Sequence, residues 1–325
     1  STADGSVANL TECRIFSNTA NVAGFGFGGG LLVKGNCTMT SCQIFENSAL
    51  HLGGGLALTG GGSASLDGCT ISKNNARDGG GVSSSGVLRM VNCALRANRA
   101  SAANRVEANQ PDVGGWGGSC TCGDGETYQV GDNNDGCGSL ACVGGTSGIC
   151  KEVDGPGAGV RVTCGNGRGG GIFAAAARPV SCTRCTLSGN VANEGGAALI
   201  AGTTTATFQG SYFQLNRADG GDGGAIKVIQ EGELLLSDSQ FEANAANSDS
   251  ASAIFYQSSS TSSLVVGCTF RNHSDAAALV TSETPLTWEC QLGQWSPHVG
   301  RIDAKDFSGC ASKCPIGTLG LSAYL

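Results

Sequence analysis

A short pattern of apolar and polar positions returns eight times along the chain. Each copy has an apolar residue, then Cys or Ser three positions later, then Ile, Leu or Phe after two more. In seven copies an Asn follows three positions after this last residue. These positions are Asn18, Asn47, Asn74, Asn98, Asn190, Asn216 and Asn244. The Cys or Ser positions recur every 24 to 29 residues apart from one interval of 92, which therefore contains an insertion.

The alternation inside each copy predicts β-strands, because it buries one face of a strand and exposes the other. One copy contains three such runs, at residues 31–33, around Met39 and at residues 42–44. Gly runs recur once per copy, as at residues 53–55, and leave no room for long helices. Short strands at this period predict an all-β fold, a right-handed parallel β-helix of about eight coils.

Stacked coils would place equivalent residues above one another, about 4.8 Å apart. We therefore expect the repeated Asn residues to form a ladder, in which each side chain hydrogen-bonds to the next coil. The Gly runs suit corners, where positive φ or a close backbone approach is needed. The coils are expected over residues 1–100 and 169–282, with the insertion at residues 101–168.

Two later copies contain Phe-x-x-Asn, at residues 213–216 and 241–244, and residues 223–226 read Gly-Gly-Ala-Ile. This combination resembles the repeat of the polymorphic outer membrane protein (Pmp) family, whose bacterial members are surface autotransporter adhesins. Similar repeats occur in large secreted proteins of algae and other protists, and the Cys content and sequons here look more like that setting. The resemblance implies a β-helix displayed outside the cell.

The insertion at residues 101–168 is rich in Gly and Cys. Its six Cys are candidates for three internal disulfides in any of 15 pairings, and such bridges would support a segment too small for its own core. They are Cys120, Cys122, Cys137, Cys142, Cys150 and Cys164. Four acidic residues are candidate Ca²⁺ ligands, although their spacing lacks the EF-hand pattern. They are Asp124, Glu126, Asp132 and Asp135.

Residues 283–325 are expected to form a Cys-rich cap or the start of another module. Residues 314–320 resemble the Cys-rich modules of ephrin-receptor-like ectodomains. The resemblance implies disulfides, with Cys290, Cys310 and Cys314 as candidates. Since such modules usually come in series, we expect the natural chain to continue past Leu325.

Composition also indicates the compartment in which the protein is expected. The 325 residues include 54 Gly, yet 40% are hydrophobic, so a core can form. The chain has 17 Cys and only 3 His, which favours disulfides in an oxidising compartment over metal sites. Three glycosylation sequons, at Asn9, Asn36 and Asn272, agree with secretion. No signal peptide is present, so we expect a processed chain or a fragment.

The charge and hydropathy patterns argue against nucleic-acid binding and against a membrane span. The formal net charge of −7 disfavours nucleic acid. The sequence has no run of 18 apolar residues, so it predicts no membrane span.

Several Cys residues have more than one interpretation. Cys13, Cys42, Cys69 and Cys93 occupy equivalent stacked positions, so neighbours are within disulfide range or pack as free thiols. A local Cys37–Cys42 bridge is a further alternative. The Cys182-x-x-Cys185 spacing is shared with redox and zinc sites, but both residues also fill repeat positions, which favours a structural role.

Catalysis has little support in the sequence. His51, His273 and His298 are far apart in the repeat map, so no triad or zinc site is expected. Asp78, Glu194 and Asp222 precede Gly runs, where a solvated turn explains them. We therefore expect no enzyme activity and no cofactor.

The sequence thus predicts an extracellular structural or adhesive protein of a surface coat, appendage or fibre. Its expected partners are other copies, other coat or fibre proteins, and glycans. The alternative is a polysaccharide lyase, glycosidase or carbohydrate-binding module on the same fold. A flat ice-binding array is more distant, because only residues 203–205 suggest it.

Overall fold

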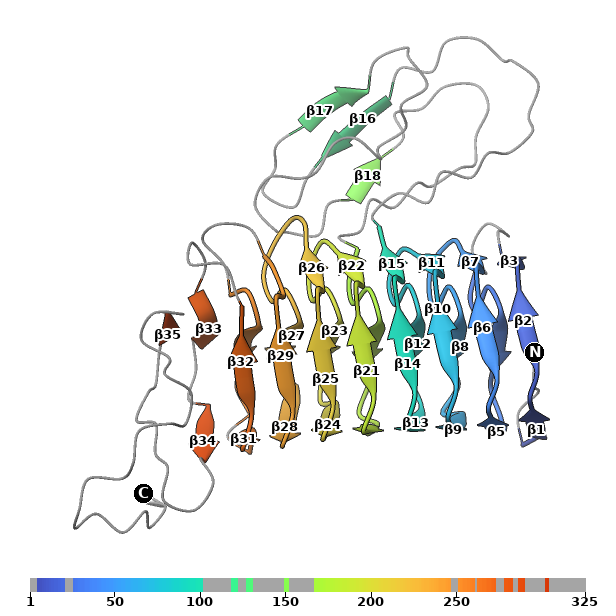
Figure 1. Cartoon of the computed structure of the whole chain (residues 1–325). Coiled ribbons are helices and arrows are strands. Elements are labelled where there is room, and N and C mark those ends of the chain that lie inside the picture. Colours follow the sequence, from blue (N-terminus) through green and yellow to red (C-terminus); the bar gives the residue numbers. More distant parts are fainter. Residues whose placement is uncertain are drawn as a thin grey trace.

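A computed structural model of the chain describes residues 5–20, 26–101, 118–121, 127–130, 149–151, 167–246, 251–260, 262–272, 278–282, 286–289 and 302–303. The regular elements in these ranges are all β-strands. Most belong to four sheets stacked along a rod, and successive turns of the chain add strands to the sheets in the same order, although one sheet ends at β26 (Figure 1). The parallel β-helix predicted from the repeats is confirmed.

Sheet 1 and sheet 2 contain the apolar and Cys or Ser halves of the repeat. Sheet 1 consists of β1 (Val7–Thr11), β5 (Asn36–Thr40), β9 (Ser63–Asp67), β13 (Val87–Val91), β20 (Val180–Thr183), β24 (Thr205–Gln209), β28 (Glu233–Ser237), β31 (Leu264–Val266) and β34 (Thr287–Glu289). Sheet 2 consists of β2 (Arg14–Phe16), β6 (Gln43–Phe45), β10 (Thr70–Ser72), β14 (Ala94–Arg96), β21 (Thr186–Ser188), β25 (Tyr212–Gln214), β29 (Gln240–Glu242) and β32 (Thr269–Arg271). Sheet 2 thus has one strand from each of the eight repeats.

Sheet 3 and sheet 4 complete each turn. Sheet 3 has two-residue strands that the sequence pattern did not predict: β3 (Thr19–Ala20), β7 (Ser48–Ala49), β11 (Asn75–Ala76), β15 (Arg99–Ala100), β22 (Val191–Ala192) and β26 (Arg217–Ala218). Sheet 4 follows the Gly runs and consists of β4 (Leu31–Val33), β8 (Leu56–Leu58), β12 (Val82–Ser84), β19 (Ile172–Ala175), β23 (Ala198–Ala201), β27 (Ile226–Gln230), β30 (Ile254–Ser258), β33 (Ala278–Ser282) and β35 (Ile302–Asp303). All neighbours are parallel except β35, which runs antiparallel to β33.

The register stacks like residues on like. The inward position of sheet 2 holds Ile15, Ile44, Ile71, Leu95, Leu187, Phe213, Phe241 and Phe270 in successive coils. Most of this column is completely buried and lies in one continuous core cluster. The column forms because a parallel pair keeps equivalent residues side by side.

The insertion leaves the stack uninterrupted. Strand β14 pairs directly with β21, and β13 with β20, although 92 residues separate the equivalent positions. Within the insertion the described strands are β16 (Gly118–Thr121), β17 (Thr127–Val130) and β18 (Ile149–Lys151), which form an antiparallel sheet. At the other end, β34 lengthens sheet 1 beyond the boundary expected at residue 282.

The corner before β8 needs Gly for two reasons. Gly53 has a φ of 66°, which favours a residue without Cβ. A Cβ on Gly54 would overlap the carbonyl oxygens of Asn75 and Gly80 in the adjoining coil. The Gly runs therefore allow coils to approach closely as well as to turn.

Two further bends in each coil have positive φ, at Gly in some coils and at other residues in the rest. One bend directly precedes the Cys or Ser position, and the other directly precedes the ladder Asn or, in the last copy, the His at position 273. The non-glycine residues at these bends are Glu12, Ser17, Ser41, Glu46, Lys73, Asn92, Ala97, Arg184, Leu215, Asp238, Ala243 and Asn272. The sequence did not indicate these bends, because their residues share no type.

Candidate functional site

The repeated Asn side chains form a hydrogen-bonded ladder along the inside of the rod. In the coil of Asn74, the side-chain Oδ1 accepts from the backbone N–H and from Nδ2 of Asn47, both at 3.0 Å. Its Nδ2 donates to the carbonyl of Ile44 at 2.9 Å and to Oδ1 of Asn98 at 3.0 Å. The same pattern links Asn18 through Asn244, and crosses the insertion between Asn98 and Asn190.

The ladder compensates for the bend that precedes it. The backbone N–H of each ladder Asn from Asn18 to Asn216 is bonded by an Asn side chain of the next coil instead of a backbone carbonyl, as Asn74 N–H is by Asn98 Oδ1 at 3.1 Å. A buried N–H without an acceptor would be costly, so the Asn is needed wherever the bend occurs.

At the other bend, the Cys or Ser side chain accepts a hydrogen bond from the backbone N–H of the neighbouring coil. The N–H of Cys42 donates to Sγ of Cys69 at 3.4 Å, and the N–H of Ser211 donates to Oγ of Ser239 at 3.1 Å. At the changeover, the N–H of Cys185 donates to Oγ of Ser211 at 3.3 Å. Cys and Ser both occur at this position because each places a small acceptor atom in the same place.

The cysteines whose side chains are described are free thiols, including the Cys37–Cys42 and Cys182–Cys185 pairs. They are Cys13, Cys37, Cys42, Cys69, Cys93, Cys182, Cys185 and Cys268. A hydrogen bond with the Cys185 side chain, together with burial, raises the pKa of Cys93 to about 12. Burial raises the pKa of Cys268 to about 12 as well. At neutral pH these two thiols stay protonated, which is typical of structural cysteines.

A row of paired charges lies along the corner before sheet 4. The Arg168 guanidinium makes two hydrogen bonds to Asp78, at 3.0 and 2.9 Å, and Arg77 donates to the same carboxylate at 3.1 Å. One coil further, Lys227 lies 2.8 Å from Glu194 and 3.1 Å from Asp222. The expectation of solvated turns is therefore wrong for Asp78, which is 0% exposed, and for Glu194, at 7%.

Pairing explains how these buried charges are tolerated. Burial alone would lower the pKa of Arg168, but its hydrogen bond to Asp78 and the charges of Asp78 and Glu194 raise that pKa. Nearby, burial and the charge of Arg77 lower the pKa of His51. Within the described ranges, no group of three His, Cys, Asp or Glu is placed to hold a metal ion.

The three sequon asparagines are exposed. Asn9 and Asn36 lie on the outer face of β1 and β5. Asn272 donates to Glu242 at 3.1 Å and is also exposed. Access for a glycosyl transferase is therefore available at each, and their glycosylation stays a prediction.

Several predicted residues lie outside the described part of the chain. These are the candidate calcium ligands Asp124, Glu126, Asp132 and Asp135, the cysteines Cys122, Cys137, Cys142, Cys164, Cys290, Cys310 and Cys314, and the histidines His273 and His298. The backbones of Cys120 and Cys150 are described, and they lie opposite each other in the register of β16 and β18.

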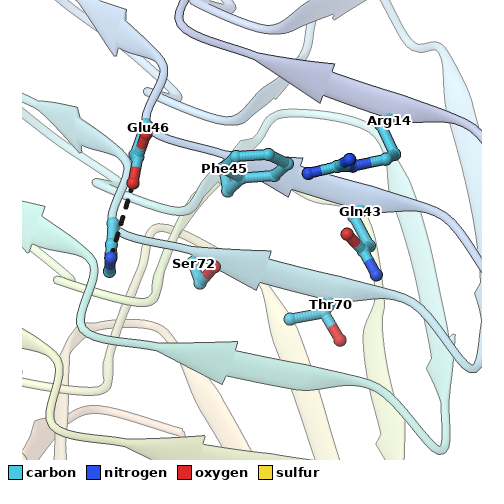
Figure 2. A pocket seen from close by; sticks show the side chains of 7 residues that line it. Arg14, Gln43, Phe45, Glu46, Thr70 and Ser72 are labelled. Carbon is cyan, nitrogen blue, oxygen red and sulfur yellow. Dashed lines mark hydrogen bonds and ion pairs between the residues drawn. The ribbon is translucent and has the colours of Figure 1, made fainter.

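A shallow depression on the outer face of sheet 2 is the candidate binding site (Figure 2). It has a volume of about 330 Å³ and is formed by β2, β6, β10 and the bend residues that follow β6 and β10. Its lining residues are Arg14, Gln43, Phe45, Glu46, Thr70, Ser72 and Lys73. The sequence did not reveal this site, since its residues come from three repeats and occupy variable positions.

Aromatic and charged groups dominate one side of the depression. The ring of Phe45 stacks on the half-exposed ring of Phe16, with centroids 5.0 Å apart and planes 5° apart. The Arg14 guanidinium points toward the Phe45 ring and lies 5.2 Å from its centroid (Figure 2). Glu46 and Lys73 form an exposed ion pair at 3.4 Å.

Comparison with known proteins adds no relative. No protein-family model matches the chain, and no match was found among curated proteins or solved structures. Among the residues searched, none forms a helix of the length and hydropathy needed to span a membrane. The functional argument therefore depends on the geometry of this chain alone.

Proposed function

We propose that this chain is an extracellular structural and adhesive rod of a cell-surface coat, appendage or fibre. The observation that carries the proposal is the Asn ladder, which joins seven coils by buried hydrogen bonds and continues across the insertion. A solenoid reinforced in every coil resists bending and local opening, as a rod requires. The paired charges at the corner agree with a structural role.

One end of the rod suits contact with a similar coil. Strands β1 to β4 are the terminal strands of their sheets, so each has an unpaired edge within the described structure. No described residue donates to Oδ1 of Asn18, which is the acceptor that an added coil would use. An added coil can come from another copy or another coat protein, which are the partners we propose, or from chain that precedes Ser1.

Labelling of intact source cells tests the location, and electron microscopy of the purified protein tests the form. The proposal requires labelling without permeabilisation and rods or filaments in the micrographs. Cleavage of any polysaccharide by the purified protein, absent after unfolding, would instead support the alternative of a lyase or glycosidase. An intracellular location would overturn the proposal.

A further inference from the structure

On the outer face of sheet 2, a column of stacked rings stops after two coils. Phe16 and Phe45 are in register on β2 and β6, and their rings stack. The next residue of this column is Ser72 on β10, followed by Arg96 on β14. A Ser therefore stands where the column would continue with a third ring.

The core of the same rod shows the spacing of a complete column. The rings of Phe213, Phe241 and Phe270 stack in successive coils with centroids 4.6 and 4.8 Å apart. The coil spacing of about 4.8 Å thus matches the distance at which rings stack. A ring placed on the free face of Phe45 would lie at the level of Ser72, whose short side chain leaves room for it (Figure 2).

The groups around this vacant level suit a ring that carries hydroxyls. Gln43, Thr70 and Ser72 can each donate and accept hydrogen bonds, and the Glu46 carboxylate accepts them. A sugar ring has an apolar face of C–H groups for stacking and a rim of hydroxyls for such partners. The depression is open at the surface, so a residue within a longer polysaccharide can enter it.

The charge of the lining selects among sugars. Lys73 is paired with Glu46, but Arg14 makes no ion pair among the described residues. Its guanidinium lies 5.5 Å from the Phe16 centroid and 5.2 Å from the Phe45 centroid, between the levels of the two rings. An acidic substituent of a sugar stacked on Phe45 would draw this exposed side chain toward the level of Ser72. We propose that this depression binds an acidic sugar residue of a polysaccharide, stacked on Phe45 with its acidic group at Arg14. This inference rests on the proposed adhesive role and gives that role a ligand class.

Substitution of Ser72 by Phe tests the site without removing any contact of the fold. The S72F variant extends the stacked column and fills the ligand position. The matched control is S188F, because Ser188 occupies the same outward column two coils further on. The probes are hexamers of galacturonic, glucuronic and mannuronic acid, each compared with its uncharged methyl ester by calorimetry.

We expect at least one acidic hexamer to bind the wild type, and S72F to weaken that binding about tenfold or more. S188F should bind like the wild type. The ester should bind up to about fivefold more weakly than the acid, and R14Q should remove that difference. Equal binding of acid and ester by the wild type, normal binding by S72F, or no binding of any acidic hexamer would overturn the inference.

The two proposals can fail separately. Surface labelling and rod formation with no binding of uronate hexamers would leave the proposed function and remove its ligand. Uronate binding by a protein that labels only inside cells would keep the site and remove the extracellular role.

Discussion

Removal of one ladder side chain should destabilise the rod far more in the middle than at the end. Asn74→Ala removes four hydrogen bonds, two accepted from Asn47 and two donated to Ile44 and Asn98. Asn74 is 1% exposed, so water cannot replace these bonds. At about 1 kcal/mol for each bond, the free energy of unfolding should fall by about 4 kcal/mol.

The matched control is Asn18→Ala at the end of the same ladder. Asn18 is exposed, and its side chain only donates, to Phe16 at 3.0 Å and to Asn47 at 2.9 Å. Since water can replace an exposed bond, we expect a loss of about 1 kcal/mol or less.

Urea unfolding followed by circular dichroism gives the two stabilities, and hydrogen exchange locates the effect. In Asn74→Ala the backbone amide of Asn47 loses its acceptor, so its exchange should accelerate more than that of amides in distant coils. Similar losses for both variants, or unchanged exchange at Asn47, would refute the idea that the ladder compensates for the bend.

Three further variants test other parts of the structure. The folded protein keeps the Cys93 proton up to about pH 12, whereas an ordinary thiol loses it near pH 9.0, so the free energy of unfolding should fall as the pH rises between these values. Urea titrations at several pH values measure this fall, and Cys93→Ser should reduce its slope by about 1.4 kcal/mol per pH unit. An unchanged slope would contradict the raised pKa of Cys93. Lys227→Met leaves Glu194 buried without its partner and should cost about 3 kcal/mol in denaturant unfolding, whereas adding Glu194→Gln should restore most of it; a double variant no better than the single one would contradict this. Leu215→Gly relieves a positive φ of 53° at an exposed side chain and should raise the melting temperature through about 0.5–1 kcal/mol of stabilisation, while Leu215→Ala should not; equal effects would refute the backbone explanation.

The repeat predicted the fold because its signals are local and periodic. Alternating residues predicted the strands, and Gly53 and its equivalents predicted the corners. The sequence by itself leaves the role of Cys69 open between a disulfide and a free thiol. Its Sγ accepts from the Cys42 N–H, a role visible only once the bend before Cys42 is known.

The row of paired charges and the depression could be recognised only from contacts between coils. Asp78 precedes a Gly run, which predicts a solvated turn. Its carboxylate instead accepts a hydrogen bond from Arg168, which follows the insertion in the sequence. Phe45 and Ser72 belong to different repeats, so only their register shows that a ring position between coils is vacant.

By itself the sequence determined the architecture, since a spacing of 24 to 29 residues with apolar, Cys or Ser, Asn and Gly positions is satisfied by stacked coils. Tertiary structure decided which variable residues meet. Outward positions carry no repeat signal, because solvent tolerates many residue types there. Stacking then brings such residues from neighbouring coils to about 4.8 Å, which creates the ion pairs at the corner and the candidate binding surface on sheet 2.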